Sequence, residues 1–276
     1  MGTLAIIISL ALLMFFAYRG ISVLILAPIM AAVAILLSGD MAYMMPQYTE
    51  TFMSALGGYI LKFFPIFLLG ALFGQLMVDS GAASSISNSI MNKLGYQRAI
   101  LTVVLACGVL TYGGVSLFVV AFAIYPIAKS MFQAANIPKR LIPGAIALGS
   151  FTFTMTALPG SPSIQNAIPI PFFGTNVFAA PGIGIISGLI MFGLGSIWLQ
   201  SRANKARNNG EGYGVDTEEG EKLEDGVTSK GEMPVFLAFL PLLLVIGVNA
   251  LFTYIIFPGM DFSSLKELYP KLDPSK

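Results

Sequence analysis

Long, nearly uninterrupted runs of apolar residues constrain this chain more than any other feature of its sequence. They cover 4–17, 21–37 and 234–257, and runs of roughly 20 apolar residues match the thickness of bilayer hydrocarbon. Several such runs cannot be one removable signal peptide. Charged residues make up 11% of the chain, against about 25% in soluble domains. The sequence therefore predicts an all-α, polytopic integral membrane protein.

The composition also excludes several classes of site. The chain has no histidine, and its single Cys107 cannot form an internal disulfide, so the common zinc sites are excluded and no cofactor is expected. A net charge of +1 with scattered charges offers no surface for nucleic acid. A serine nucleophile such as Ser116 or Ser161 would lack a general base, since neither polar cluster around them holds His, Asp or Glu. The chain is not expected to be an enzyme.

The pattern of apolar segments predicts the organisation of the chain. Simple spans are predicted at about 3–18, 21–38, 52–78, 178–199 and 234–257. Two other apolar segments, 99–128 and 141–170, are interrupted by polar residues in their middle, and a polar stretch rich in small residues, 79–98, precedes the first of them. Residues 200–232 are too hydrophilic to bury a core and are predicted to form a flexible cytoplasmic loop.

Charge placement favours a re-entrant hairpin at 99–128. If this segment enters and leaves the membrane on one side, eleven of the fifteen Lys and Arg share one face, which the positive-inside rule makes cytoplasmic. They are Arg19, Lys93, Arg98, Lys129, Lys139, Arg140, Arg202, Lys205, Arg207, Lys222 and Lys230. A full crossing at 99–128 would divide them between the two faces.

With the hairpin, residues 1–199 cross the membrane five times and form one repeat unit. The helix within 233–276 then starts on the opposite face, as the first helix of an inverted second unit does. Only one helix of that unit is present before Lys276. We therefore expect a truncated piece of a transporter, inactive alone because half of its site would come from the second unit.

Two clusters of Gly, Pro, Ser and Thr, at 111–116 and 156–163, interrupt the apolar segments. Broken backbone in a membrane is tolerated where it is buried in protein or lines a wet cavity. Free N–H groups at such breaks suit a carboxylate, and free carbonyls and hydroxyls suit Na⁺ or a proton carrier. An isolated break can also be a kink or a tight helix contact, but two successive breaks favour a binding site. The candidate substrate-binding residues are Thr111, Tyr112, Gly113, Gly114, Ser116, Thr156, Pro159, Gly160, Ser161, Ser163 and Asn166.

Asp79 closes the predicted span 52–78, just before Ser80 and Gly81. Two interpretations stay open for it. It is either the interfacial end of a helix, or a coupling carboxylate near the ligand, since carboxylates inside a membrane are usually functional.

Several motifs in order resemble one transporter family. The stretch 70–83, GALFGQLMVDSGAA, is similar to a segment of the gluconate permease (GntP) family that ends in Asp-Ser-Gly-Ala/Gly-Ala. The motifs at 134–138 (AANIP) and 158–162 (LPGSP) continue in the order of that family, and the resemblance covers about 60–200. It implies the ion transporter superfamily, with paired inverted repeats, re-entrant hairpins and broken helices, and transport of gluconate or related hydroxy acids together with protons.

The chain departs from the gluconate carriers at both breaks. Where they tend to have an acidic residue at the hairpin tip, this chain has the neutral 112–116 (YGGVS), and where they tend to have histidines near the Pro-rich break it has 155–157 (MTA) and 160–163 (GSPS). These departures keep alternatives to gluconate and to proton coupling open.

The expected function is secondary active transport, in which a cation, the proton, drives symport of a small organic anion such as gluconate. The alternatives are a short hydroxy monocarboxylate of the hydroxybutyrate type, Na⁺ coupling, and a passive channel. The expected partners are the anion and the lipid bilayer of a bacterial inner membrane, and a homodimer is left open.

Overall fold

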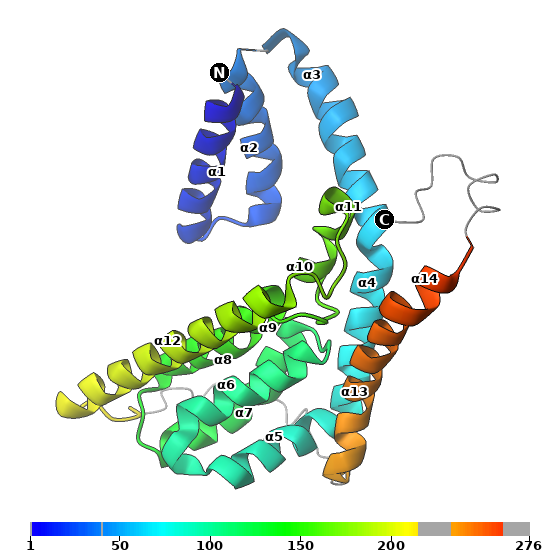
Figure 1. Ribbon diagram of the computed structural model, residues 1–276. Coiled ribbons are helices and arrows are strands. Elements are labelled where there is room, and N and C mark those ends of the chain that lie inside the picture. Colours follow the sequence, from blue (N-terminus) through cyan, green and yellow to red (C-terminus); the bar gives the residue numbers. More distant parts are fainter. Residues whose placement is uncertain (1, 40, 215–232, 262–276) are drawn as a thin grey trace. The chain divides into compact units, whose positions relative to one another are not determined.

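The computed structural model describes residues 2–39, 41–214 and 233–261, and every element in these ranges is helical. The chain forms two compact parts, residues 1–65 and 66–276. The helix α4 (Met53–Asp79) begins in the first part and ends in the second. Each part is described separately (Figure 1).

The first part contains a pair of apolar helices. Helices α1 (Gly2–Tyr18) and α2 (Val23–Ser38) pack against each other across a short turn, and Gly20 in that turn adopts φ +87°. Short elements η1 (Met41–Tyr43), α3 (Met44–Pro46) and η2 (Gln47–Phe52) then lead into α4.

The second part holds the remaining helices. In chain order they are α5 (Ala82–Leu94), η3 (Tyr96–Arg98), α6 (Ala99–Tyr112), α7 (Leu117–Ala134), η4 (Lys139–Leu141), α8 (Ile142–Ser150), α9 (Phe153–Thr156), α10 (Ile164–Ala167), α11 (Ile170–Phe173), α12 (Pro181–Asn208), α13 (Val235–Leu251), η5 (Phe252–Ile256) and α14 (Phe257–Gly259). Helix α6 lies against α5, α7, α8, α9 and α12. Because protein surrounds it, α6 is apolar on all sides rather than on one stripe.

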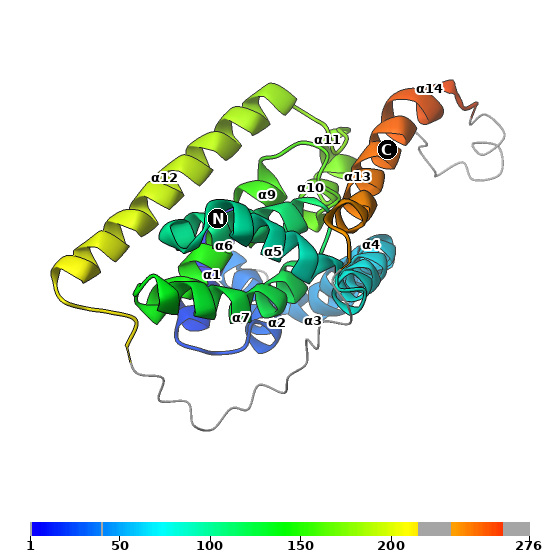
Figure 2. The same cartoon turned by 90° about the horizontal axis from the view of Figure 1, so that it is seen from below.

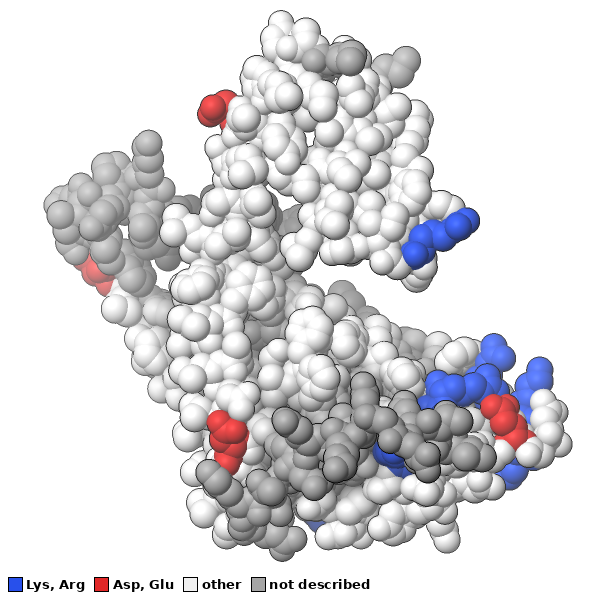
Figure 3. Space-filling model, turned by 180° about the vertical axis from the view of Figure 1, so that it is seen from behind, with Lys and Arg blue, Asp and Glu red and all other residues white. Residues whose placement is uncertain are grey.

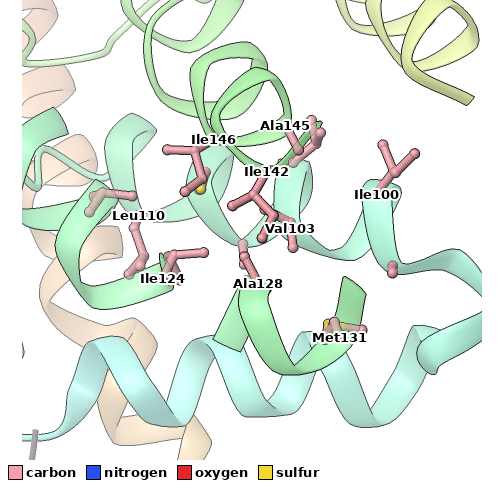
Figure 4. Close-up of a cluster of buried hydrophobic side chains, with 14 of the residues drawn as sticks. Ile100, Val103, Leu110, Ile124, Ala128, Met131, Ile142, Ala145 and Ile146 are labelled. Atoms are coloured by element: carbon pink, nitrogen blue, oxygen red, sulfur yellow. The ribbon is translucent and has the colours of Figure 1, made fainter. Parts of the chain in front are cut away.

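The core of this part lies where α6, α7 and α8 meet (Figure 4). Leu110 of α6, Ile124 and Ala128 of α7, and Ala145 of α8 are fully buried. Since lipid is as apolar as these side chains, close packing rather than water exclusion holds membrane helices together, and small residues let the backbones approach. At Gly149 of α8 an added Cβ would lie 2.5 Å from the carbonyl oxygen of Val104 in α6, so α8 needs glycine there.

The predicted spans all fall on helices, but the predicted count is supported only in part. Within the described residues, four helical stretches are long and apolar enough to cross a membrane: Met44–Asp79, Leu117–Ala134, Pro181–Asn208 and Val235–Gly259. A fifth is gained if the pair Ala82–Leu94 and Tyr96–Tyr112, bent by 101°, makes one broken span or re-entrant loop. Helices α1 and α2 are shorter, with 17 and 16 residues.

The segment of the predicted hairpin forms two helices, α6 and α7. Helices α6 and α7 pack against each other on either side of the turn at 113–116, and the start of α6 lies near α7 through η3. The second arm runs to Ala134, beyond the predicted end at 128, and with 18 residues it is long enough to cross a membrane by itself. The re-entrant depth of the hairpin stays a prediction.

The prediction of a flexible loop from residue 200 is wrong for its first part. Helix α12 continues to Asn208, with Lys205 and Arg207 in its last turn, where cations favour the helix dipole. The helix stops at Gly210, which adopts φ +73°. The helix thus continues into polar sequence. A change from apolar to polar residues does not by itself end a helix, whereas a glycine at its C-terminus does. The rest of the predicted loop, 215–232, lies outside the described residues.

The residues just after α12 are hydrogen-bonded to the segment between α7 and α8. Arg140 donates two hydrogen bonds to Glu211, Nε to Oε1 at 2.7 Å and Nη2 to Oε2 at 2.6 Å. The backbone N–H of Tyr213 donates to Oδ1 of Asn136 at 2.9 Å. These contacts hold the residues after α12 beside the segment between α7 and α8. Figure 3 shows Lys and Arg side chains gathered at one end of the molecular surface that it draws.

Candidate functional site

The first polar break forms the tip of the α6–α7 hairpin. Helix α6 ends in a tight turn in which the N–H of Val115 donates to the carbonyl of Leu110 at 3.1 Å. The turn depends on Gly114, which adopts φ +99°, a conformation that other residues rarely take. Ser116 then stands immediately before the first turn of α7.

The second polar break separates α9 from α10 and has no regular structure at 157–163. Gly160 adopts φ +82°, and its N–H donates to the carbonyl of Val177 at 2.8 Å. An added Cβ at Gly160 would lie 2.5 Å from the ring of Phe178. Within 141–170 the structure has three short helices, α8 to α10, and the start of α11, and a further break at 151–152 separates α8 from α9.

The two breaks meet in space. The hydroxyl of Tyr112 donates to the carbonyl of Pro159 at 2.8 Å, across 47 residues of sequence. An added Cβ at Gly114 would lie 2.8 Å from Cγ of Pro162. The hairpin tip and the Pro-rich break are therefore in contact, and Gly114 lies where the tip meets the ring of Pro162.

A cavity of about 290 Å³ opens beside this contact. Its lining residues come from α4, the hairpin tip, the start of α7 and the Pro-rich break: Ile66, Phe67, Gly70, Ala71, Thr111, Gly114, Val115, Ser116, Leu117, Phe118, Met155, Pro162, Ser163, Ile164 and Gln165. No charged side chain is among these lining residues, and most of them are apolar.

Four of the predicted site residues line this cavity, namely Thr111, Gly114, Ser116 and Ser163. Thr111 is 1% exposed, and its hydroxyl has no hydrogen-bond partner in the described part of the chain. A buried polar atom is normally paired, so an unpaired hydroxyl beside a cavity suits a ligand or a water. The start of α7 adds backbone N–H groups and the positive end of a helix dipole, which favour an anion.

Other predicted residues hold the break in shape rather than lining the cavity. The hydroxyl of Ser161, fully buried, is 2.7 Å from that of Ser163. Asn166 donates from Nδ2 to the carbonyls of Leu158 and Ser161, both at 3.3 Å. Thr156 donates to the carbonyl of its own helical turn, at Thr152, and lies outside the lining set. Tyr112, Gly113, Pro159 and Gly160 also lie outside the lining set, in the contact between the breaks or beside it.

Asp79 is exposed at the end of α4 and accepts a hydrogen bond from Nε2 of Gln75 at 2.9 Å. It does not line the cavity. A role in coupling stays a prediction. Within the described ranges there is also no group of three or more His, Cys, Asp or Glu that could hold a metal ion.

The sequence reasoning missed the part of the cavity that α4 supplies. Gly70 lines the cavity, and an added Cβ at Gly74 would lie 3.4 Å from the backbone nitrogen of Ser116. The sequence does carry a sign of this contact. Gly70 and Gly74 are four residues apart, which is the spacing of small residues that lets membrane helices approach closely. Gln165, which is not among the candidate residues predicted from the sequence, lines the cavity as well.

Helix α13 packs on the outer side of the hairpin tip. Leu242 is 3% exposed, and an added Cβ at Gly113 would overlap its side chain. A Cβ added at Gly114 would lie 3.9 Å from Cγ1 of Val245, which is one helical turn beyond Leu242. The tip is therefore enclosed between α13 and the Pro-rich break.

Comparison with known proteins gives a consistent picture. A family model described as GntP family permease matches residues 1–265. An uncharacterized transporter named YxjC, from Bacillus subtilis, is 49% identical over 286 residues, which cover 100% of this chain and 60% of the relative. An uncharacterized transporter from Haemophilus influenzae is 35% identical over 127 residues, or 46% of this chain and 30% of the relative. The chain thus spans less than two thirds of either relative, and no solved structure shows significant similarity to it.

Proposed function

Because the chain belongs to the GntP permease family, we propose that it forms part of a proton-coupled symporter of a small organic anion, such as gluconate or another hydroxy acid. Family membership makes it a multi-pass membrane permease and not an enzyme. The proposed location is a bacterial inner membrane, since both relatives are bacterial.

The observation that supports the proposal is the cavity at the meeting of the two breaks. The carboxylate of the anion would accept hydrogen bonds from Thr111, Ser116 and Ser163 and from the first N–H groups of α7. The hydroxyl of Thr111, buried and unpaired among the described residues, would gain a partner only when the anion binds. Gln165 would orient the hydroxyl groups of the substrate.

The test is uptake of radiolabelled gluconate by the protein in vesicles, with an imposed proton gradient, an imposed Na⁺ gradient, or neither. We expect uptake to follow the proton gradient, and to fall about tenfold or more in Ser163→Ala, since a hydrogen bond to a charged group contributes about 1.5–3 kcal/mol. Ser130→Ala is the matched control, because Ser130 lies on α7 outside the cavity. Uptake that ignores both gradients would identify a passive channel, and unchanged uptake in Ser163→Ala would reject the site.

A second candidate substrate is a short hydroxy monocarboxylate of the hydroxybutyrate type. The cavity favours it in one respect, because apolar residues such as Ile66, Phe67 and Met155 form much of the lining, and no charged side chain does. A chain with five hydroxyl groups would leave several of them facing apolar surface, which is costly. Competition against labelled gluconate tests this alternative: 3-hydroxybutyrate should compete more strongly than unlabelled gluconate if the apolar lining determines selectivity.

A further inference from the structure

A second cavity, of about 240 Å³, lies between α5 and the start of α13, away from the site described above. The two helices pack against each other in this region (Figure 2). Five of its lining residues belong to α5: Ser85, Asn88, Ser89, Asn92 and Lys93. Their spacing places them on one face of the helix. Met233 and Val235 supply the rest of the lining.

The Ser and Asn side chains that line this cavity form no hydrogen bonds with other described residues. Ser85 is 8% exposed, and its hydroxyl donates to or accepts from no other group in the described ranges. The same is true of the side chains of Asn88, Ser89 and Asn92. Ser85 is the buried member of this set, Asn88 and Ser89 are half-buried, and Asn92 is exposed. The cavity therefore presents amide and hydroxyl donors that the described part of the protein does not use.

The cavity also has a positive character. Lys93 lines the cavity, is exposed to solvent and forms no ion pair with any described residue. Helix α13 begins beside it at Val235, and no side chain caps its N-terminus. The first N–H groups of a helix have no partner within the helix, and they carry the positive end of its dipole. No acidic side chain is among the lining residues.

We propose that this cavity binds a phosphate group. The ammonium group of Lys93, the two amides, the two hydroxyls and the free N–H groups of α13 provide more donors than the two oxygens of a carboxylate can accept. Phosphate oxygens accept charge-assisted hydrogen bonds from such donors. Two sources share this chemistry: the headgroup of an anionic phospholipid, which basic pockets between membrane helices recognise, and a soluble phosphate.

The test is native mass spectrometry of the detergent-purified chain, titrated with phosphatidylglycerol or with the zwitterionic phosphatidylcholine. We expect retained phosphatidylglycerol, and about tenfold weaker retention in Lys93→Gln, since one hydrogen bond to a charged group is lost. Lys93→Arg should keep binding, because the charge remains. Lys205→Gln, a loss of charge at an exposed position of α12 outside the cavity, is the matched control.

Inorganic phosphate distinguishes the two sources. If millimolar phosphate does not displace the lipid from the native chain, the headgroup is the ligand, and if phosphate displaces it, or binds alone with the same dependence on Lys93, the ligand is a soluble phosphate. Equal retention of both lipids together with no phosphate binding would overturn the proposal. So would equal losses in Lys93→Gln and Lys205→Gln, with both variants shown by circular dichroism to be folded.

Discussion

At the scale of single residues, Gly114 is a position where backbone conformation and packing both require glycine. Its φ of +99° strains any other residue, and an added Cβ would lie 2.8 Å from Cγ of Pro162. Gly114→Ala should therefore lose about 1–2 kcal/mol from strain alone and also separate the hairpin tip from the Pro-rich break. We expect a lower melting temperature and a loss of uptake.

The control for Gly114 is Gly39→Ala. Gly39 adopts φ +86°, but nothing lies within 4 Å of an added Cβ. Both variants introduce backbone strain, but only Gly114→Ala also brings a Cβ into steric conflict with Pro162. If Gly39→Ala and Gly114→Ala reduce uptake equally, the contact with Pro162 has no functional role.

Tyr112 joins the two breaks through a single hydrogen bond, from its hydroxyl to the carbonyl of Pro159 at 2.8 Å. Tyr112→Phe keeps the ring and removes only this bond, so a loss of about 1 kcal/mol is expected. Thermal unfolding of the detergent-purified chain measures the loss. Tyr96→Phe, at an exposed position in η3, should leave the melting temperature unchanged, and equal shifts in both variants would contradict the assignment.

At the scale of helices, the contact between α6 and α8 depends on Gly149. An added Cβ there would lie 2.5 Å from the carbonyl oxygen of Val104 and 2.6 Å from Cβ of Cys107. Gly149→Ala must push the two helices apart, and overpacking of this kind costs about 1–3 kcal/mol. Gly193→Ala, in open space on α12, should be neutral or slightly stabilising in the same unfolding measurement. A neutral result for Gly149→Ala would mean that α8 can shift freely.

The helices were largely predictable from the sequence, because an apolar run in a membrane has few options besides a helix. The ends of the helices were less predictable. The predicted loop from 200 overlooked the last turns of α12, where polar residues continue the helix as far as Asn208. The additional break at 151–152 carries no proline, and its glycine precedes it at Gly149. That break accompanies the close contact with α6, which a linear sequence does not display.

At the scale of the whole second part, Arg140 and Glu211 join segments 71 residues apart. The hydrogen bonds from Arg140 lower the pKa of the Glu211 carboxyl, and Glu211 raises the pKa of Arg140. A lowered carboxyl pKa stabilises the folded state at pH values above the ordinary pKa of glutamate. This stabilisation is lost as the pH falls through the lowered pKa. Because both side chains are exposed to solvent, the effect is small.

This pair predicts a pH-dependent difference between the native chain and Glu211→Gln. At pH 7 the native chain should have the higher melting temperature, and the difference should disappear as the pH falls below the ordinary range of glutamate. Glu50→Gln, which removes an exposed carboxylate from the first part of the chain, is the matched control. A difference that persists at low pH would show that Glu211 acts by some means other than its charge.

The candidate site was predictable to the extent that it depends on local breaks. Glycine, proline and hydroxyl residues inside apolar segments marked 111–116 and 156–163, and the structure brings these breaks together. The lining from α4 was not predicted, because Ile66 and Phe67 are ordinary apolar residues until a fold places them beside a cavity. Which hydroxyls line the cavity and which hold the backbone likewise depends on side-chain direction, as Thr111 and Thr156 illustrate.

The packing of α13 on the hairpin tip has a consequence for how related sequences can vary. Gly113 has no room for a side chain because Leu242 occupies the space. Any lineage that replaces the glycine must first shorten the residue at 242, and the two positions should therefore change together among relatives. Gly113→Ala alone should therefore destabilise the fold, whereas it should be tolerated together with Leu242→Ala. During evolution the change at 242 would have to come first.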